Sequence, residues 1–168
     1  AATFKDILEA PDDLFKQFFS CVTILKNFSR RCFRLFNVHG EFLIDMCIEI
    51  IQSKDIEKRN LDLIELCFEL AESLICNYND LPDELDKRIH RIIEPALNGT
   101  SSQTGFMLQF LTRLATSFSL TRCYYLDLNK AFLPALMGTI QPDSQYVLDY
   151  LLKTKYWSLE PEFELPLQ

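Results

Sequence analysis

Apolar residues recur every three or four positions along most of the chain, with charged residues between them, which is the spacing of amphipathic helices. The first such series consists of Phe15, Phe18, Val22, Leu25, Phe28, Cys32 and Phe36. It predicts a core-facing line on a helix that runs from about residue 12 to residue 36, with Ser29 as the alternative cap of a second, short helix. Val38-His39-Gly40 interrupts the pattern, so we expect the chain to break there.

The same spacing continues to residue 156. The expected helices span about residues 12–36, 41–52, 60–77, 81–97, 104–118, 125–137 and 143–156. The fourth should end at Asn98-Gly99, because glycine readily takes the left-handed conformation that closes a helix. No segment alternates between apolar and polar residues as a strand would. The sequence therefore predicts an all-α chain.

A short motif occurs twice. Pro-Ala-Leu-x-Gly-Thr stands at residues 95–100 and again at 134–139, each time near the end of one expected helix and before the next. The proline removes one backbone donor and bends its helix, and the glycine lets the chain reverse. Each unit is thus expected to be a helical hairpin, which must stack on a neighbour to bury its apolar face.

A weaker similarity lies upstream. The segment LIDMCIEI at 43–50 matches LIELCFEL at 63–70 position by position. It indicates either one helix reused or two acidic amphipathic helices that converged, and we favour convergence.

The two-helix unit of about forty residues, with Pro95 and Pro134 in its first helix, resembles the HEAT and armadillo-like helical repeats. The resemblance is clearest over residues 82–157. It implies a short solenoid of about seven to eight helices built from stacked hairpins. It implies no particular family and no functional residues.

Composition narrows the class of function. The 168 residues are 48% hydrophobic and 24% charged, with a net charge of −7. A surface built mainly for nucleic acid needs dense positive charge, which this chain lacks. No apolar run approaches the roughly 20 residues that span a bilayer. We expect one helical-repeat domain over residues 1–156.

The cysteines favour a reducing compartment. Four of the six lie among apolar residues of expected helices, where they behave as small buried hydrophobes. These are Cys32, Cys47, Cys67 and Cys76. We therefore expect free thiols and an intracellular protein, nuclear or cytoplasmic. Two glycosylation sequons, at Asn27 and Asn98, leave open a secreted helical bundle held by disulfides.

Basic residues gather near the end of the first expected helix. Lys26, Arg30 and Arg34 are spaced by four, and Arg31 stands beside them. On one helix they would form a stripe of like charge. The stripe is either paired with acids of this chain, such as Asp45 or Glu49, or a docking surface for an acidic peptide or a nucleic-acid backbone.

Two phenylalanines fall off the expected core line, Phe19 and Phe33. Either this helix is buried from two sides, or these rings are exposed anchors for a partner.

The last twelve residues, 157–168, differ from the rest in combining two prolines, three acids and no base. We expect an extended acidic and apolar tail, with Trp157 and Phe163 as candidate contacts. It would cap the last hairpin, mark a domain boundary or serve as a linear motif for another subunit.

Candidates for catalysis are few. The two histidines, His39 and His90, fit capping and surface roles, and no phosphate-binding loop or nucleophile motif occurs. Cysteine and histidine show no metal spacing. We expect a non-enzymatic scaffold without cofactor or metal that binds a protein partner, such as an acidic or amphipathic helix, inside a larger complex. Attachment to nucleic acid through the basic helix is the alternative.

Overall fold

A computed structural model of the protein describes most of the first 97 residues and part of the segment that follows. The described residues are 4–29, 31, 33–53, 57–77, 83–97, 105–107, 109–110 and 113–114. Their regular structure is entirely helical, without a strand, which confirms the expected class. The elements are a 3-10 helix, η1 (Phe4–Glu9), and the α-helices α1 (Asp12–Phe28), α2 (Phe33–Ile51), α3 (Lys58–Ile75) and α4 (Asp83–Leu97).

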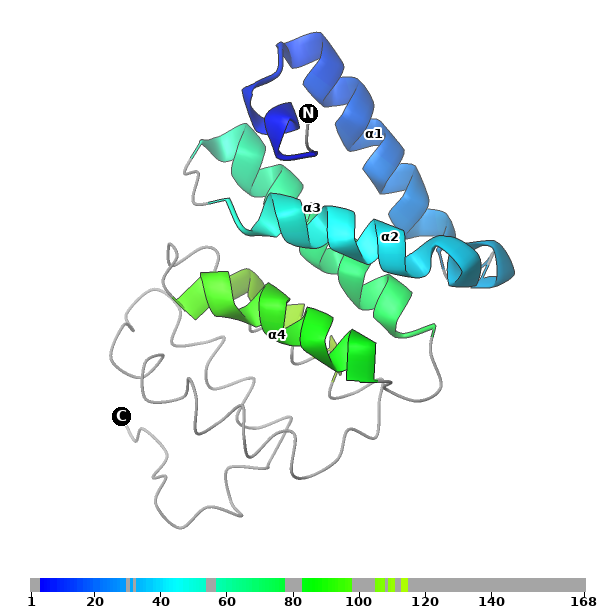
Figure 1. Ribbon diagram of the computed structural model, residues 1–168. Helices are drawn as coiled ribbons and strands as arrows, with labels where there is room; N and C mark the ends of the chain where they lie inside the picture. The colour runs from blue at the N-terminus through cyan, green and yellow to red at the C-terminus, as the bar shows by residue number, and fades with distance from the viewer. Residues whose placement is uncertain are drawn as a thin grey trace, which may run out of the picture.

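The helices pack in two rows (Figure 1). Helix α1 contacts α3, and α2 contacts α4, while α2 and α3 pack most closely against each other. The short helix η1 touches both α1 and α2, and lies between the start of α1 and the C-terminal part of α2. The central pair, α2 and α3, is therefore buried from two sides.

The core is built mainly by these two central helices. The similar segments 43–50 and 63–70 lie on α2 and α3, and both bury most of their apolar residues. One acid of each segment pairs with a neighbouring helix: Asp45 with Arg88 of α4, and Glu69 with Lys26 of α1. These two ion pairs join the central helices to the helices on either side.

The helical residues described between 105 and 114 also belong to this core. Met107, Phe110 and Leu114 are buried, and the Phe110 ring lies 6.0 Å from that of Phe68 on α3. This placement agrees with the helix expected over residues 104–118.

The N-terminal segment is tied to the start of α3 by one arginine. The Arg59 guanidinium donates hydrogen bonds to the backbone carbonyls of Leu8 and Ala10 and to the Asp12 carboxylate. It also lies 4.4 Å from the centre of the Phe15 ring, in a cation–π contact. These contacts fix η1 and the first turn of α1 against α3.

The first two helices do not end where the sequence pattern places them. Helix α1 ends at Phe28, and α2 runs from Phe33 through Gly40, so the expected break at residues 38–40 is wrong. Gly40 is buried inside α2, where the absence of a side chain permits close packing. The alternative interruption near Ser29 is the one the structure contains.

Side chains of α3 hold the chain at this break. The buried Ser29 hydroxyl shares a hydrogen bond with the Ser73 hydroxyl and donates another to the Lys26 carbonyl. The Asn77 amide donates to the Ser29 carbonyl at 2.9 Å. The Ser29 carbonyl and hydroxyl therefore form hydrogen bonds with residues distant in sequence, whereas in a continuous helix the carbonyl would bond the next turn of the same helix.

Helix α4 ends at Leu97, as expected, with Pro95 in its last turn. The turn at residues 98–100, the second copy of the motif at 134–139, the helices expected over 125–137 and 143–156 and the tail at 157–168 lie outside the described residues.

Candidate interaction surface

The basic stripe expected on one helix is divided between two. Lys26 lies near the end of α1 and Arg34 in the first turn of α2, so the two cannot share one continuous helical face. The Lys26 ammonium pairs with the Glu69 carboxylate, and its side chain is 36% exposed. Arg31 is exposed in the turn between the helices, and Arg30 lies outside the described residues.

The acids expected to pair with this stripe have other partners. Asp45 binds Arg88, and a Glu49 carboxylate oxygen accepts a 3.4 Å hydrogen bond from the backbone N–H of Lys5. Lys26 is paired within the chain, but through Glu69, which the sequence pattern did not single out.

The aromatic candidates have different surroundings. Phe19 is partly buried against the core, and its ring stacks on that of Phe15 at 6.4 Å. Phe33 begins α2, and Trp157 and Phe163 lie outside the described residues.

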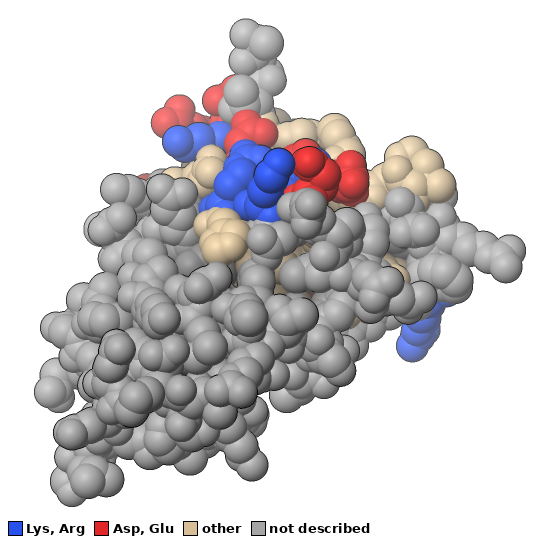
Figure 2. Space-filling model, turned by 60° about the horizontal axis from the view of Figure 1, so that its bottom comes forward, with Lys and Arg blue, Asp and Glu red and all other residues tan. Residues whose placement is uncertain are grey.

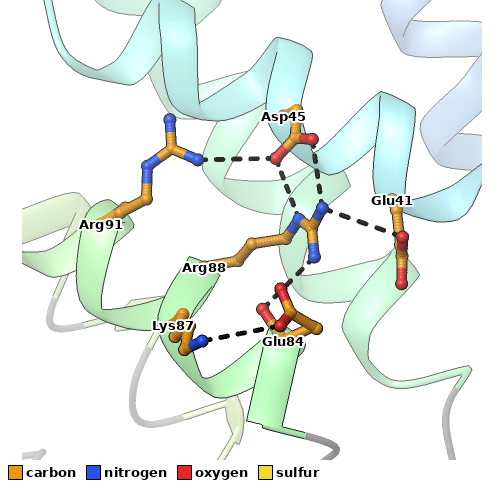
Figure 3. A network of polar contacts seen from close by, with 6 residues as sticks. All are labelled: Glu41, Asp45, Glu84, Lys87, Arg88 and Arg91. Atoms are coloured by element: carbon orange, nitrogen blue, oxygen red, sulfur yellow. Dashed lines mark hydrogen bonds and ion pairs between the residues drawn. The ribbon is translucent and has the colours of Figure 1, made fainter.

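A charged network joins α2 to α4 (Figure 3). The Arg88 guanidinium donates to both carboxylate oxygens of Asp45, at 2.9 and 3.2 Å, and lies 3.8 Å from Glu41. Arg91 approaches the same Asp45 carboxylate at 3.7 Å. Hydrogen bonds to Asp45 raise the pKa of Arg88 above its ordinary value. With its side chain only 15% exposed, Arg88 serves to hold the two helices together.

A polar pocket of about 410 Å³ lies between α1, α3 and the residues after α4. Its lining consists of Lys26, Asn27, Glu69, Glu72, Ser73 and Arg113. Charges of both signs line it, and no group of three or more potential metal-ligating side chains occurs in the described part of the chain. The pocket therefore has the character of a solvated ion-pair cluster.

Buried thiols lie at the centre of the α2–α3 contact. Cys47 and Cys67 are fully buried, and a hydrogen bond between them, together with burial, raises the pKa of the Cys67 thiol well above its ordinary value. Such thiols are unreactive. Cys21 on α1 is exposed instead, and none of the four described cysteines forms a disulfide.

Helix α1 carries two adjacent lines of residues. The inner stripe faces α3 and consists of the apolar Phe15, Phe19 and Val22, followed by the polar Lys26 and, just after the helix, Ser29. The outer stripe precedes each of these residues by one position, and consists of Leu14, Phe18, Cys21, Leu25 and Phe28. Successive residues of an α-helix are rotated by about 100° around its axis, so the outer stripe faces sideways from the core. The expected core line mixed residues of both stripes.

The outer stripe is largely open to solvent. Leu14 is 52% exposed and Phe28 is 47% exposed, and Ile24 at the border of the stripe is 56% exposed. Phe18 and Leu25 are partly buried against the core. Val38 and Phe42, on the neighbouring α2, are also exposed. Large apolar side chains gathered on one face mark an interaction site more often than isolated ones do.

An apolar pocket of about 260 Å³ lies at the N-terminal end of the outer stripe. It is lined by Phe4, Asp6, Ile7, Ala10, Leu14 and Phe18. Helix η1 forms one wall and α1 the other, so the stripe leads into a hollow that could take an aromatic or aliphatic side chain.

The histidines show no catalytic arrangement among the described residues. His39 lies on an exposed side of α2, not in a break, and His90 lies on an exposed side of α4. None of the helices that the structure describes is long and apolar enough to cross a bilayer.

Comparison with models of protein families, with curated proteins and with solved structures finds no match for this chain. Residue roles therefore cannot be carried over from another protein. The choice of the outer stripe as the candidate interaction surface rests on its exposure and geometry.

Proposed function

We propose that this chain is a non-enzymatic protein–protein interaction scaffold that works within the cell as a segment or subunit of a larger complex. Its docking surface is the outer stripe of α1, together with the pocket between η1 and α1. The observation that carries the proposal is a second apolar stripe on α1, which the domain's own core covers only in part and which leaves Leu14, Cys21 and Phe28 exposed. A helix that only closed a core would need one such face.

The packing of the helices supports a HEAT-like stack. In such stacks each unit contacts only its neighbours, and alternate helices lie in the same row. Helices α1 and α3 pair in this way, as do α2 and α4. The repeated Pro-Ala-Leu-x-Gly-Thr motif, with its first copy in and after α4, suggests that the stacking continues along the chain.

Charge favours a protein partner over nucleic acid. Lys26 is paired with Glu69, and Arg88 with Asp45. On the face that Figure 2 shows, most Lys and Arg atoms of the described residues lie directly beside Asp and Glu atoms. A nucleic-acid site needs cations free to replace counterions on phosphates.

The test is affinity capture with Phe28→Asp, which places a carboxylate on the outer stripe. Asn27→Asp is the matched control, because it adds the same charge one residue away, on an exposed polar side of α1. Both variants should first match the original chain in circular dichroism and in urea unfolding. A buried unpaired carboxylate costs about 2 kcal/mol or more, so Phe28→Asp should weaken capture of a specific partner by about thirtyfold.

Asn27→Asp should capture the same partner as the original chain. Equal capture by all three proteins would show that the outer stripe is not the docking surface. Equal loss in both variants would assign the effect to charge alone.

A further inference from the structure

We infer that the outer stripe of α1 binds the outer stripe of a second copy of this chain, with the two helices antiparallel and the two-fold axis close to Cys21. This inference rests on the proposed function, since it names the occupant of the same surface. Three features carry it: the symmetry of the stripe, the charges at its two ends and the pocket beside Leu14.

The outer stripe is nearly symmetric about its middle residue. Leu14 and Phe28 each stand seven residues from Cys21, with Phe18 three before it and Leu25 four after it. In an antiparallel pair, Leu14 of one copy faces Phe28 of the other, and Phe18 faces Leu25. Each apolar side chain therefore meets another, which is the self-complementarity that a two-fold interface requires.

Charge sets the direction of the pair. Asp13 lies in the first turn of α1, beside Asp12, whose carboxylate is bound by Arg59, and the exposed Arg31 follows the end of the helix. An antiparallel pair places each Arg31 near Asp13 of the other copy, at both ends of the interface. A parallel pair would place arginine against arginine and aspartate against aspartate. The dipoles of the two helices also favour the antiparallel arrangement.

The pocket at the start of the stripe accepts the end of the partner helix. Leu14 lines the pocket between η1 and α1, and an antiparallel partner brings its Phe28 to this point. Phe28 is 47% exposed in the single chain, so its ring is available for insertion. Two such insertions, one at each end, would fix the register of the pair.

The size of the surface predicts a weak dimer. From Leu14 to Phe28 the stripe is about 21 Å long. One helix pair of this length buries less than the roughly 1,200 Å² of a standard interface, which is typical of transient association. We therefore expect a dissociation constant on the order of 10 μM.

The first experiment is sedimentation velocity over a concentration series, with Arg31→Glu, Asp13→Arg and the double variant. Each single change places like charges at both ends of the pair and should weaken association about tenfold or more. The double variant exchanges the two charges and should recover most of the affinity. Lys16→Glu, also exposed on α1 but turned away from the stripe, is the control and should leave association unchanged.

The second experiment tests the register with an oxidant. Diamide takes two electrons and two protons from a pair of thiols, which leaves one disulfide. Cys21 should form a covalent dimer readily, and Cys21→Ser should abolish it. Gln17→Cys in the Cys21→Ser background should cross-link at least tenfold more slowly, because the two copies of residue 17 then lie about 12 Å apart along the helix axis.

The outcomes separate this inference from the proposed function. A monomer at every concentration up to about 1 mM, well above the expected dissociation constant, overturns the second copy as occupant. If Phe28→Asp still abolishes capture of a different protein, the proposed function stands. If Phe28→Asp abolishes neither self-association nor capture of a partner, the second copy as occupant and the proposed function are both wrong. Equal cross-linking through residues 17 and 21 would overturn the antiparallel arrangement.

Discussion

Individual acids on α3 differ in how well their charge is compensated. Glu69 pairs with Lys26, whereas Glu65, one turn earlier on the same side of the helix, lies between Asp62 and Glu69. The pKa of Glu65 is raised above its ordinary value, and burial is the largest cause. The negative charges of Glu69 and Asp62 raise this pKa further, whereas the positive charges of Arg113 and Lys26 lower it. The folded protein therefore holds the Glu65 proton more tightly than the unfolded chain does.

This residue makes stability depend on pH. The native state binds more protons at Glu65 than the unfolded state does. The contribution of Glu65 to the free energy of unfolding therefore falls as the pH rises from about 4.5 through the raised pKa. Glu65→Gln should therefore unfold in more urea than the original chain at pH 7, and the difference should shrink as the pH is lowered towards 4.5. Glu9→Gln, exposed on η1, is the control and should show no such trend. A Glu65 pKa at or below 4.5 in an NMR titration of its carboxyl carbon would contradict this account.

At the level of elements, polar side chains decide where helices end and how they join. The bounds of α3 and α4 lie within two residues of those expected from sequence, because their apolar spacing and end signals are local. The break between α1 and α2 could not be placed in this way. It depends on Ser73 and Asn77, which are far away in sequence and meet Ser29 only after folding.

The join between α2 and α4 depends on Arg88. Arg88→Met keeps an unbranched apolar stem but removes the guanidinium, and among the described residues it leaves Asp45 with the longer contact to Arg91. Loss of two charged hydrogen bonds should lower the free energy of unfolding by about 1.5–3 kcal/mol. Lys87→Met is the matched control, because Lys87 is 72% exposed and, among the described residues, pairs with Glu84 of its own helix. Its effect should stay below about 0.5 kcal/mol in the same urea measurement. Equal effects of the two substitutions would show that the network does not stabilise the join.

At the scale of the whole molecule, the sequence predicted the helical class, but it did not show which faces of α1 the core leaves open. It pointed to the segment from residue 15 to residue 36, yet it took Lys26, Arg30 and Arg34 for one stripe and placed Phe28 in the core. Periodicity shows that a helix has apolar faces, but it does not show which of two adjacent faces the core covers. That choice is made by α3 and η1, which pack on one side of α1 and leave Phe28 and Ile24 exposed.

The outer stripe of α1 is open to solvent at Leu14, Cys21 and Phe28, and the thiol of Cys21 reports on this exposure directly. The measurement is the rate of alkylation by iodoacetamide in dilute protein, with each cysteine followed by peptide mass spectrometry. Cys21 should react about as fast as a free thiol, and Cys47 and Cys67 should react at least about a hundredfold more slowly, because both are fully buried. In concentrated protein, Cys21 alone should become protected. A Cys21 thiol as slow as Cys47 in dilute protein would mean that the outer stripe is covered within the chain, and would contradict the docking surface.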